Sequence, residues 1–226
     1  HHGILHNAWW DRVRRSQEIT NSPATWVSAM RSLDPGCETL YRAVKRAFPG
    51  SLAVAINEPC DTGADYSVYD LMRRGEPIDR PPAVEELPHT SQQFVRPVKE
   101  YRWSSLVDHT ATEQFVGLWS GSWRGRSWPL PRFTWVNFAL TDAAMHEGGP
   151  YSEIAAAALR DTDGRIAEML AAVERAGVFD RTAFFVVADH GMEESDPSCT
   201  GSWAEALDAS GVAHRDEAYG FIYVNP

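Results

Sequence analysis

Two short clusters of carboxylate and imidazole side chains are the residues of this sequence best suited to chemistry. Asp142 and His146, the first pair, stand four residues apart, and Asp189 and His190, the second pair, are adjacent. Carboxylate oxygens and imidazole nitrogens are ligands that Zn²⁺ and Mn²⁺ accept in proteins. Either pair alone could be structural, because an aspartate after a strand often caps the next helix. Both pairs in one crevice could hold two cations, as in two-metal hydrolases.

The sequence around the two pairs predicts the elements that position them. Residues 133–140 have strand composition, and residues 152–176 carry apolar side chains at the three- and four-residue steps of a long amphipathic helix. Residues 183–188 are continuously apolar, as in a strand covered on both faces. Strand, helix and strand of these lengths form a right-handed βαβ unit. Because such a unit places both strand carboxyl ends at one sheet edge, we expect the two pairs to meet there.

The first half of the chain is less regular. A helical pattern runs over residues 38–48 and a buried strand over residues 52–56. Between residues 58 and 132, prolines and glycines interrupt the pattern, but many aromatic side chains there must be buried somewhere. We interpret residues 58–132 as an irregular insertion or cap. The sequence therefore predicts one α/β domain over residues 1–226 with a mostly parallel sheet.

Composition excludes several classes of protein. The 226 residues carry a formal net charge of −10, so the basic surface that binds a nucleic-acid duplex is not expected. No apolar run is longer than that of residues 183–188, which is far shorter than the ~20 residues of a membrane span. Cys37, Cys60 and Cys199 are too few and too widely spaced for a disulfide framework, which favours reduced thiols and a cytoplasmic location. The sequence specifies no oligomeric state.

The order of the motifs resembles the alkaline phosphatase superfamily, and within it the type I phosphodiesterase and nucleotide pyrophosphatase family. The motifs that carry the resemblance are His2-Gly3-Ile4-x-x-Asn7 with Trp10-Asp11, Thr141-Asp142-x-x-x-His146-x-Gly-Gly-Pro150-x-Ser152, and Val-Val-Ala-Asp189-His190-Gly191-Met192. They cover the first dozen residues and roughly residues 133–192, so residues 58–132 carry no matching motif.

This resemblance implies a three-layer α/β/α fold and a metal-dependent phosphoric-ester hydrolase that acts on a small phosphate ester such as a nucleotide. Each pair would bind one divalent metal ion, Zn²⁺ or else Mn²⁺ or Mg²⁺, and Asn7 would be a catalytic residue that donates to a phosphoryl oxygen. A metal-activated Thr or Ser would attack phosphorus. In the family this nucleophile lies before the position of residue 1. We therefore expect a chain truncated at both ends and inactive alone.

Other interpretations of the motifs stay open. The same metal ions could serve a phosphonate hydrolase, a phosphomutase or a sulfatase of the same superfamily. The chain could instead be a catalytically inactive homologue that serves as a binding module, because fold alone does not fix function. The residue at the nucleophile position would discriminate between an enzyme and an inactive homologue.

Overall fold

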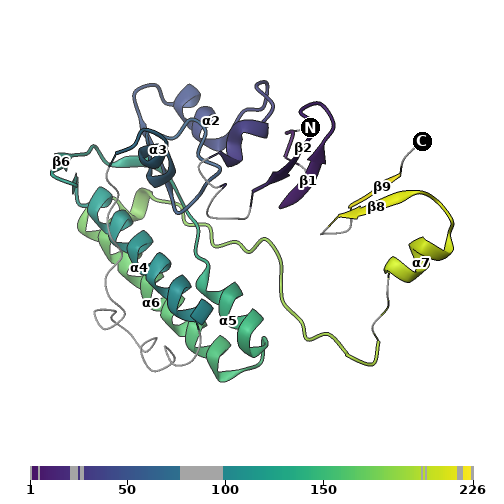
Figure 1. Ribbon diagram of the computed structural model, residues 1–226. Coiled ribbons are helices and arrows are strands. Elements are labelled where there is room, and N and C mark those ends of the chain that lie inside the picture. Colours follow the sequence, from purple (N-terminus) through teal and green to yellow (C-terminus); the bar gives the residue numbers. More distant parts are fainter. Residues whose placement is uncertain are drawn as a thin grey trace. The chain divides into compact units, whose positions relative to one another are not determined.

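The chain divides into two compact units (Figure 1). The computed structural model describes residues 2–4, 6–20, 25, 28–76, 99–199, 201, 203–217 and 221–224. The terminal unit comprises residues 1–38 and 195–226, and the central unit comprises residues 39–194. The central unit contains both predicted metal-binding pairs.

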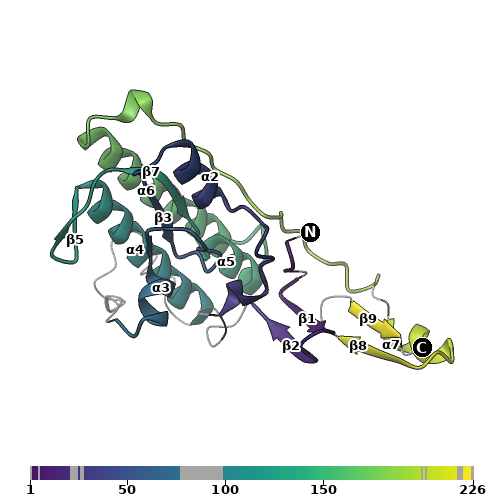
Figure 2. The ribbon, with the colours of Figure 1, turned by 90° about the horizontal axis from the view of Figure 1, so that it is seen from above.

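A parallel three-stranded sheet forms the middle of the central unit (Figure 2). Its strands, in spatial order, are β4 (Tyr66–Ser67), β3 (Leu52–Ile56) and β7 (Pro131–Val136). Val54 of β3 is opposite Tyr66 on one side and Thr134 on the other. The strand predicted over residues 52–56 and the parallel sheet are thus confirmed.

Helices flank this sheet in the central unit. Those that the structure describes are α2 (Leu40–Ala47), α3 (Val68–Arg73), α4 (Lys99–Trp119), α5 (Leu140–Gly148) and α6 (Glu153–Arg175). Helices α4, α5 and α6 pack side by side (Figures 1 and 2). The predicted long helix is confirmed as α6, which begins where the Ser152 hydroxyl accepts a hydrogen bond from the Ala155 amide at 3.1 Å.

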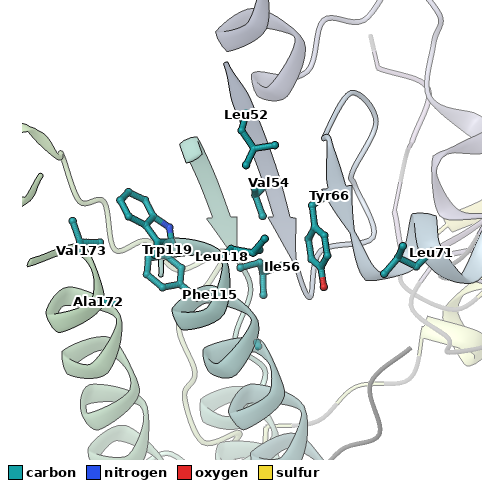
Figure 3. Close-up of a cluster of buried hydrophobic side chains, with 11 residues drawn as sticks. Leu52, Val54, Ile56, Tyr66, Leu71, Phe115, Leu118, Trp119, Ala172 and Val173 are labelled. Carbon is teal, nitrogen blue, oxygen red and sulfur yellow. The ribbon is translucent and has the colours of Figure 1, made fainter. Parts of the chain in front are cut away.

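The central strand β3 shows how the helices cover both faces of the sheet. Successive strand residues point to opposite faces. Leu52, Val54 and Ile56 join a core cluster with residues of α4 and α6 (Figure 3). The alternate residues Ala53 and Ala55 pack instead with Tyr41 of α2 and with side chains of β7. These two cores give the three-layer α/β/α arrangement that the resemblance implied.

The stretch 58–132 differs from the irregular structure expected of it. Residues 77–98 lie outside the described residues, but residues 99–119 form α4, a helix of 21 residues. Its buried face follows helical spacing, with polar residues such as Ser105, Asp108 and Thr112 at positions where apolar side chains are usual. These polar residues conceal the apolar period that would have indicated a helix.

The predicted strand over residues 183–188 was wrong. These residues are extended but pair with no strand that the structure describes. Phe185 is 86% exposed and Val187 is 71% exposed, so the segment is not covered on both faces. An apolar run favours an extended backbone, but a strand also needs a neighbour to take up its N–H and C=O groups. The predicted βαβ unit therefore lacks its second strand.

Short elements complete the chain. A hairpin of β5 (Ser122–Trp123) and β6 (Arg126–Ser127) follows α4, and a 3₁₀ turn, η4 (Phe179–Arg181), follows α6. The terminal unit contains hairpins of β1 (Ala8–Asp11) with β2 (Ser16–Ile19) and of β8 (His214–Glu217) with β9 (Phe221–Val224), together with η1 (Ala29–Ser32) and α7 (Trp203–Ala209). Among the helices that the structure describes, none has the length and apolar character needed to cross a bilayer.

Candidate metal centre

The first pair of predicted ligands lies on α5. Asp142 is in the first turn of this helix and His146 is in its last turn. Residues four apart on a helix share a face, and the Nε2 atom of His146 lies 3.4 Å from Oδ1 of Asp142. Both side chains are more than half exposed, so a solvated cation can reach them.

The second pair follows the extended segment 183–188. The His190 amide donates a hydrogen bond to Oδ1 of Asp189 at 3.1 Å, and its ring Nδ1 donates to the Gly191 carbonyl at 2.8 Å. Because Nδ1 carries the proton that it donates, Nε2 of the neutral ring has a lone pair with which it can bind a metal ion. That Nε2 atom lies 3.6 Å from Oδ2 of Asp189.

Asp142 connects the two pairs. Its Oδ1 atom lies 3.4 Å from Nε2 of His146 and 4.0 Å from Nε2 of His190. Carboxylate and imidazole are donor types that suit Zn²⁺ or Mn²⁺, but these four side chains do not close around one coordination site here. Asp189 points farther into solvent and is 91% exposed. Within the described part of the chain, no three His, Cys, Asp or Glu side chains are grouped closely enough to hold a metal ion.

The segment after His190 is attached to the loop between α5 and α6. The Tyr151 hydroxyl lies 2.9 and 3.0 Å from the two carboxylate oxygens of Glu193. Gly149 has φ of +86°, and a Cβ atom there would lie 3.0 Å from Oε1 of Glu194. The Tyr151–Glu193 hydrogen bond connects the segment after the second pair to the loop after α5. The sequence patterns did not identify the Tyr151–Glu193 contact.

Charge around His190 favours its protonated form. The hydrogen bond to the Gly191 carbonyl raises the pKa of His190 above its ordinary value, and the carboxylates of Asp189 and Asp142 add to this effect. A metal ion that binds Nε2 of this ring competes with a proton for the same lone pair.

A residue outside both pairs determines where α5 begins. The N-cap residue of α5 is Ala139, which has no side-chain acceptor. Asp108 of α4, about 30 residues earlier in the chain, supplies the acceptor. Its carboxylate accepts hydrogen bonds from the amides of Ala139 at 2.8 Å and Leu140 at 3.0 Å. Burial raises the pKa of Asp108 to about 7, although these two hydrogen bonds and the positive charge of Arg165 act in the opposite direction. The sequence patterns did not identify Asp108.

Asn7 belongs to the terminal unit, immediately before β1. Its carbonyl accepts a hydrogen bond from the Thr20 amide at 2.8 Å, which extends the β1–β2 hairpin. The Asn7 residue is exposed. Its role as a donor to a phosphoryl oxygen stays a prediction.

Comparison with known proteins gives a family for the whole chain. A family model described as type I phosphodiesterase / nucleotide pyrophosphatase matches residues 1–226. No curated protein matches the sequence. The family match includes residues 58–132, where no motif of the resemblance was found, and it agrees with the resemblance drawn from the two pairs.

Proposed function

The chain belongs to the type I phosphodiesterase/nucleotide pyrophosphatase family of the alkaline phosphatase superfamily, and from this we propose that it serves metal-dependent hydrolysis of phosphodiesters or nucleotide pyrophosphates. In this proposal Asp142 and His146 bind one divalent cation, and Asp189 and His190 bind a second. Zn²⁺ is the expected ion, with Mn²⁺ or Mg²⁺ as alternatives.

The observation that carries this proposal is the 4.0 Å approach of Nε2 of His190 to Oδ1 of Asp142. The two residues belong to different pairs, and the whole of α6 lies between them in the sequence. Family membership supports the hydrolase class, and this approach supports the assignment of the two pairs to one centre.

Charge explains why such a protein needs cations. The chain has a formal net charge of −10, which repels an anionic phosphate ester. Bound divalent ions supply positive charge that polarises the phosphoryl group and stabilises the transition state. Asp142 and Asp189 would hold these ions through carboxylate oxygens, and the two imidazoles would bind through Nε2.

Hydrolysis of a chromogenic phosphodiester by the full-length gene product tests the proposal. We expect turnover that a chelator removes and added Zn²⁺ or Mn²⁺ restores. Asp142→Asn should abolish it, whereas Glu174→Gln, which changes an exposed carboxylate of α6, should not. Turnover that persists in chelator or in Asp142→Asn would contradict the proposal. Metal binding without turnover would favour an inactive homologue.

A further inference from the structure

We infer that Asp108 is a positioning residue for the metal centre, because its buried carboxylate fixes the first turn of α5 and so holds Asp142 and His146 in place. This inference rests on the proposed function, since it gives Asp108 a part in metal binding. Asp108 acts through the backbone of α5, because it accepts from the amides of Ala139 and Leu140.

The hydrogen bonds show how Asp108 controls this helix. The first amides of any helix have no partner within the helix and need an outside acceptor. The two carboxylate oxygens of Asp108 accept from successive amides, those of Ala139 and Leu140. Two bonds to one planar group fix both the position and the direction of the helix start. Asp142 comes two residues later in the same turn, so any shift of that turn moves its carboxylate.

Packing fixes the rotation of α5 about its axis. Leu140 and Ala144 are fully buried and pack with Tyr101 of α4 and Ala158 of α6. Leu140 and Ala144 therefore form the inward face of the helix, and the exposed first pair occupies its outer face. Asp108 fixes one end of the helix, and these apolar contacts fix its rotation.

Water cannot replace the Asp108 carboxylate as the acceptor for the first amides of α5. The Asp108 side chain has no exposed surface, so water cannot take over the two acceptor positions without opening the layer of helices. A negative charge at a helix N-terminus is also stabilised by the helix dipole. The positive charge of Arg165 lowers the pKa of Asp108. The Nη2 atom of Arg165 donates to the Ser105 hydroxyl of α4 at 2.9 Å.

Asp108→Asn tests the inference, with Asp161→Asn as the matched control. Asn keeps the size of the side chain but offers one acceptor oxygen, so one helix amide loses its partner. Asp161 is equally buried and accepts from the Tyr101 hydroxyl at 3.1 Å, whereas the first amides of α5 donate to Asp108. At pH 8 we expect Asp108→Asn to raise the dissociation constant for Mn²⁺ about tenfold or more, whereas Asp161→Asn leaves it unchanged.

Hydrogen exchange of the metal-free protein gives a second measurement that needs no bound ion. The amides of Ala139 and Leu140 should exchange faster in Asp108→Asn and at the wild-type rate in Asp161→Asn. Asp108→Glu, which keeps both acceptors, is the second variant and should restore part of the protection. Wild-type exchange in Asp108→Asn, or equal losses of Mn²⁺ affinity in both Asn variants, would overturn the inference. A wild-type protein that binds no Mn²⁺ would overturn the proposed metal centre, and exchange would still decide whether Asp108 holds α5.

Discussion

Nε2 of His190 lies 4.0 Å from Oδ1 of Asp142, which joins a histidine from an extended segment to an aspartate on a helix. The expected route to this approach was a pair of neighbouring strands. The structure achieves it with α5 on one side and with the hydrogen bond from the Tyr151 hydroxyl of the α5–α6 loop to Glu193 on the other. The second pair is thus held by polar contacts at the surface.

Asp189→Ala should reduce the number of bound metal ions from two to one per chain. The substitution removes the carboxylate of the second pair and leaves Asp142 and His146 unchanged. Metal content after dialysis against dilute Zn²⁺ checks this. Asp180→Ala, at an exposed aspartate of η4, is the control and should keep both ions. Full occupancy in Asp189→Ala would remove this residue from the proposed centre.

Gly149→Ala should weaken binding at the second pair. Gly149 has φ of +86°, and the added Cβ atom would press against the Glu194 carboxylate. Gly177 is the matched control, because its φ of +71° imposes similar backbone strain with no atom within 4 Å of the added Cβ. We expect both substitutions to lower the free energy of unfolding by about 1 kcal/mol. Titration with Zn²⁺ should show weaker binding in Gly149→Ala alone; equal affinity in both variants would contradict this role of Glu194.

Local patterns predicted the elements whose signal is short-range. Strand β3 is a run of five buried apolar residues, and α6 has a serine cap and apolar steps of three and four. The first pair was found because a carboxylate and an imidazole follow a predicted strand, and Asp142 and His146 do come after β7, on α5. Helix α2 was predicted from the same kind of periodicity.

Long-range pairing was what the patterns failed to predict. The run 183–188 has strand composition, but whether it pairs depends on a neighbouring strand elsewhere in the chain. Asp108 caps α5 from α4, and nothing in either local sequence indicates that contact. In α4, buried polar residues serve packing and hydrogen bonds, so the period of apolar residues is incomplete. The missed features all depend on contacts between distant segments.

Leu118→Ala should destabilise the central unit strongly. Leu118 of α4 is fully buried in the core beneath β3 (Figure 3), and removal of its side chain leaves a cavity. Such substitutions cost roughly 2–5 kcal/mol. Leu159→Ala on α6 is the control, because Leu159 is 52% exposed and should lose far less. Urea unfolding of the two variants measures the difference, and similar losses would contradict the core described for this unit.

The contribution of Asp108 to stability should decrease as the pH rises from about 4 to about 7. Burial raises the pKa of Asp108 from 3.8 to about 7, so in this range the folded state binds a proton that the unfolded state has released. The stabilising contribution is complete below the unfolded pKa and is lost as the pH rises through the folded pKa, by at most about 1.4 kcal/mol per pH unit. Asp108→Asn cannot titrate and should lack this slope. Urea unfolding of the wild type and of Asp108→Asn at pH 5, 6, 7 and 8 measures the difference between their free energies of unfolding. This difference should change up to pH 7 and then level off. A constant difference across the series would show that Asp108 titrates at its ordinary pKa.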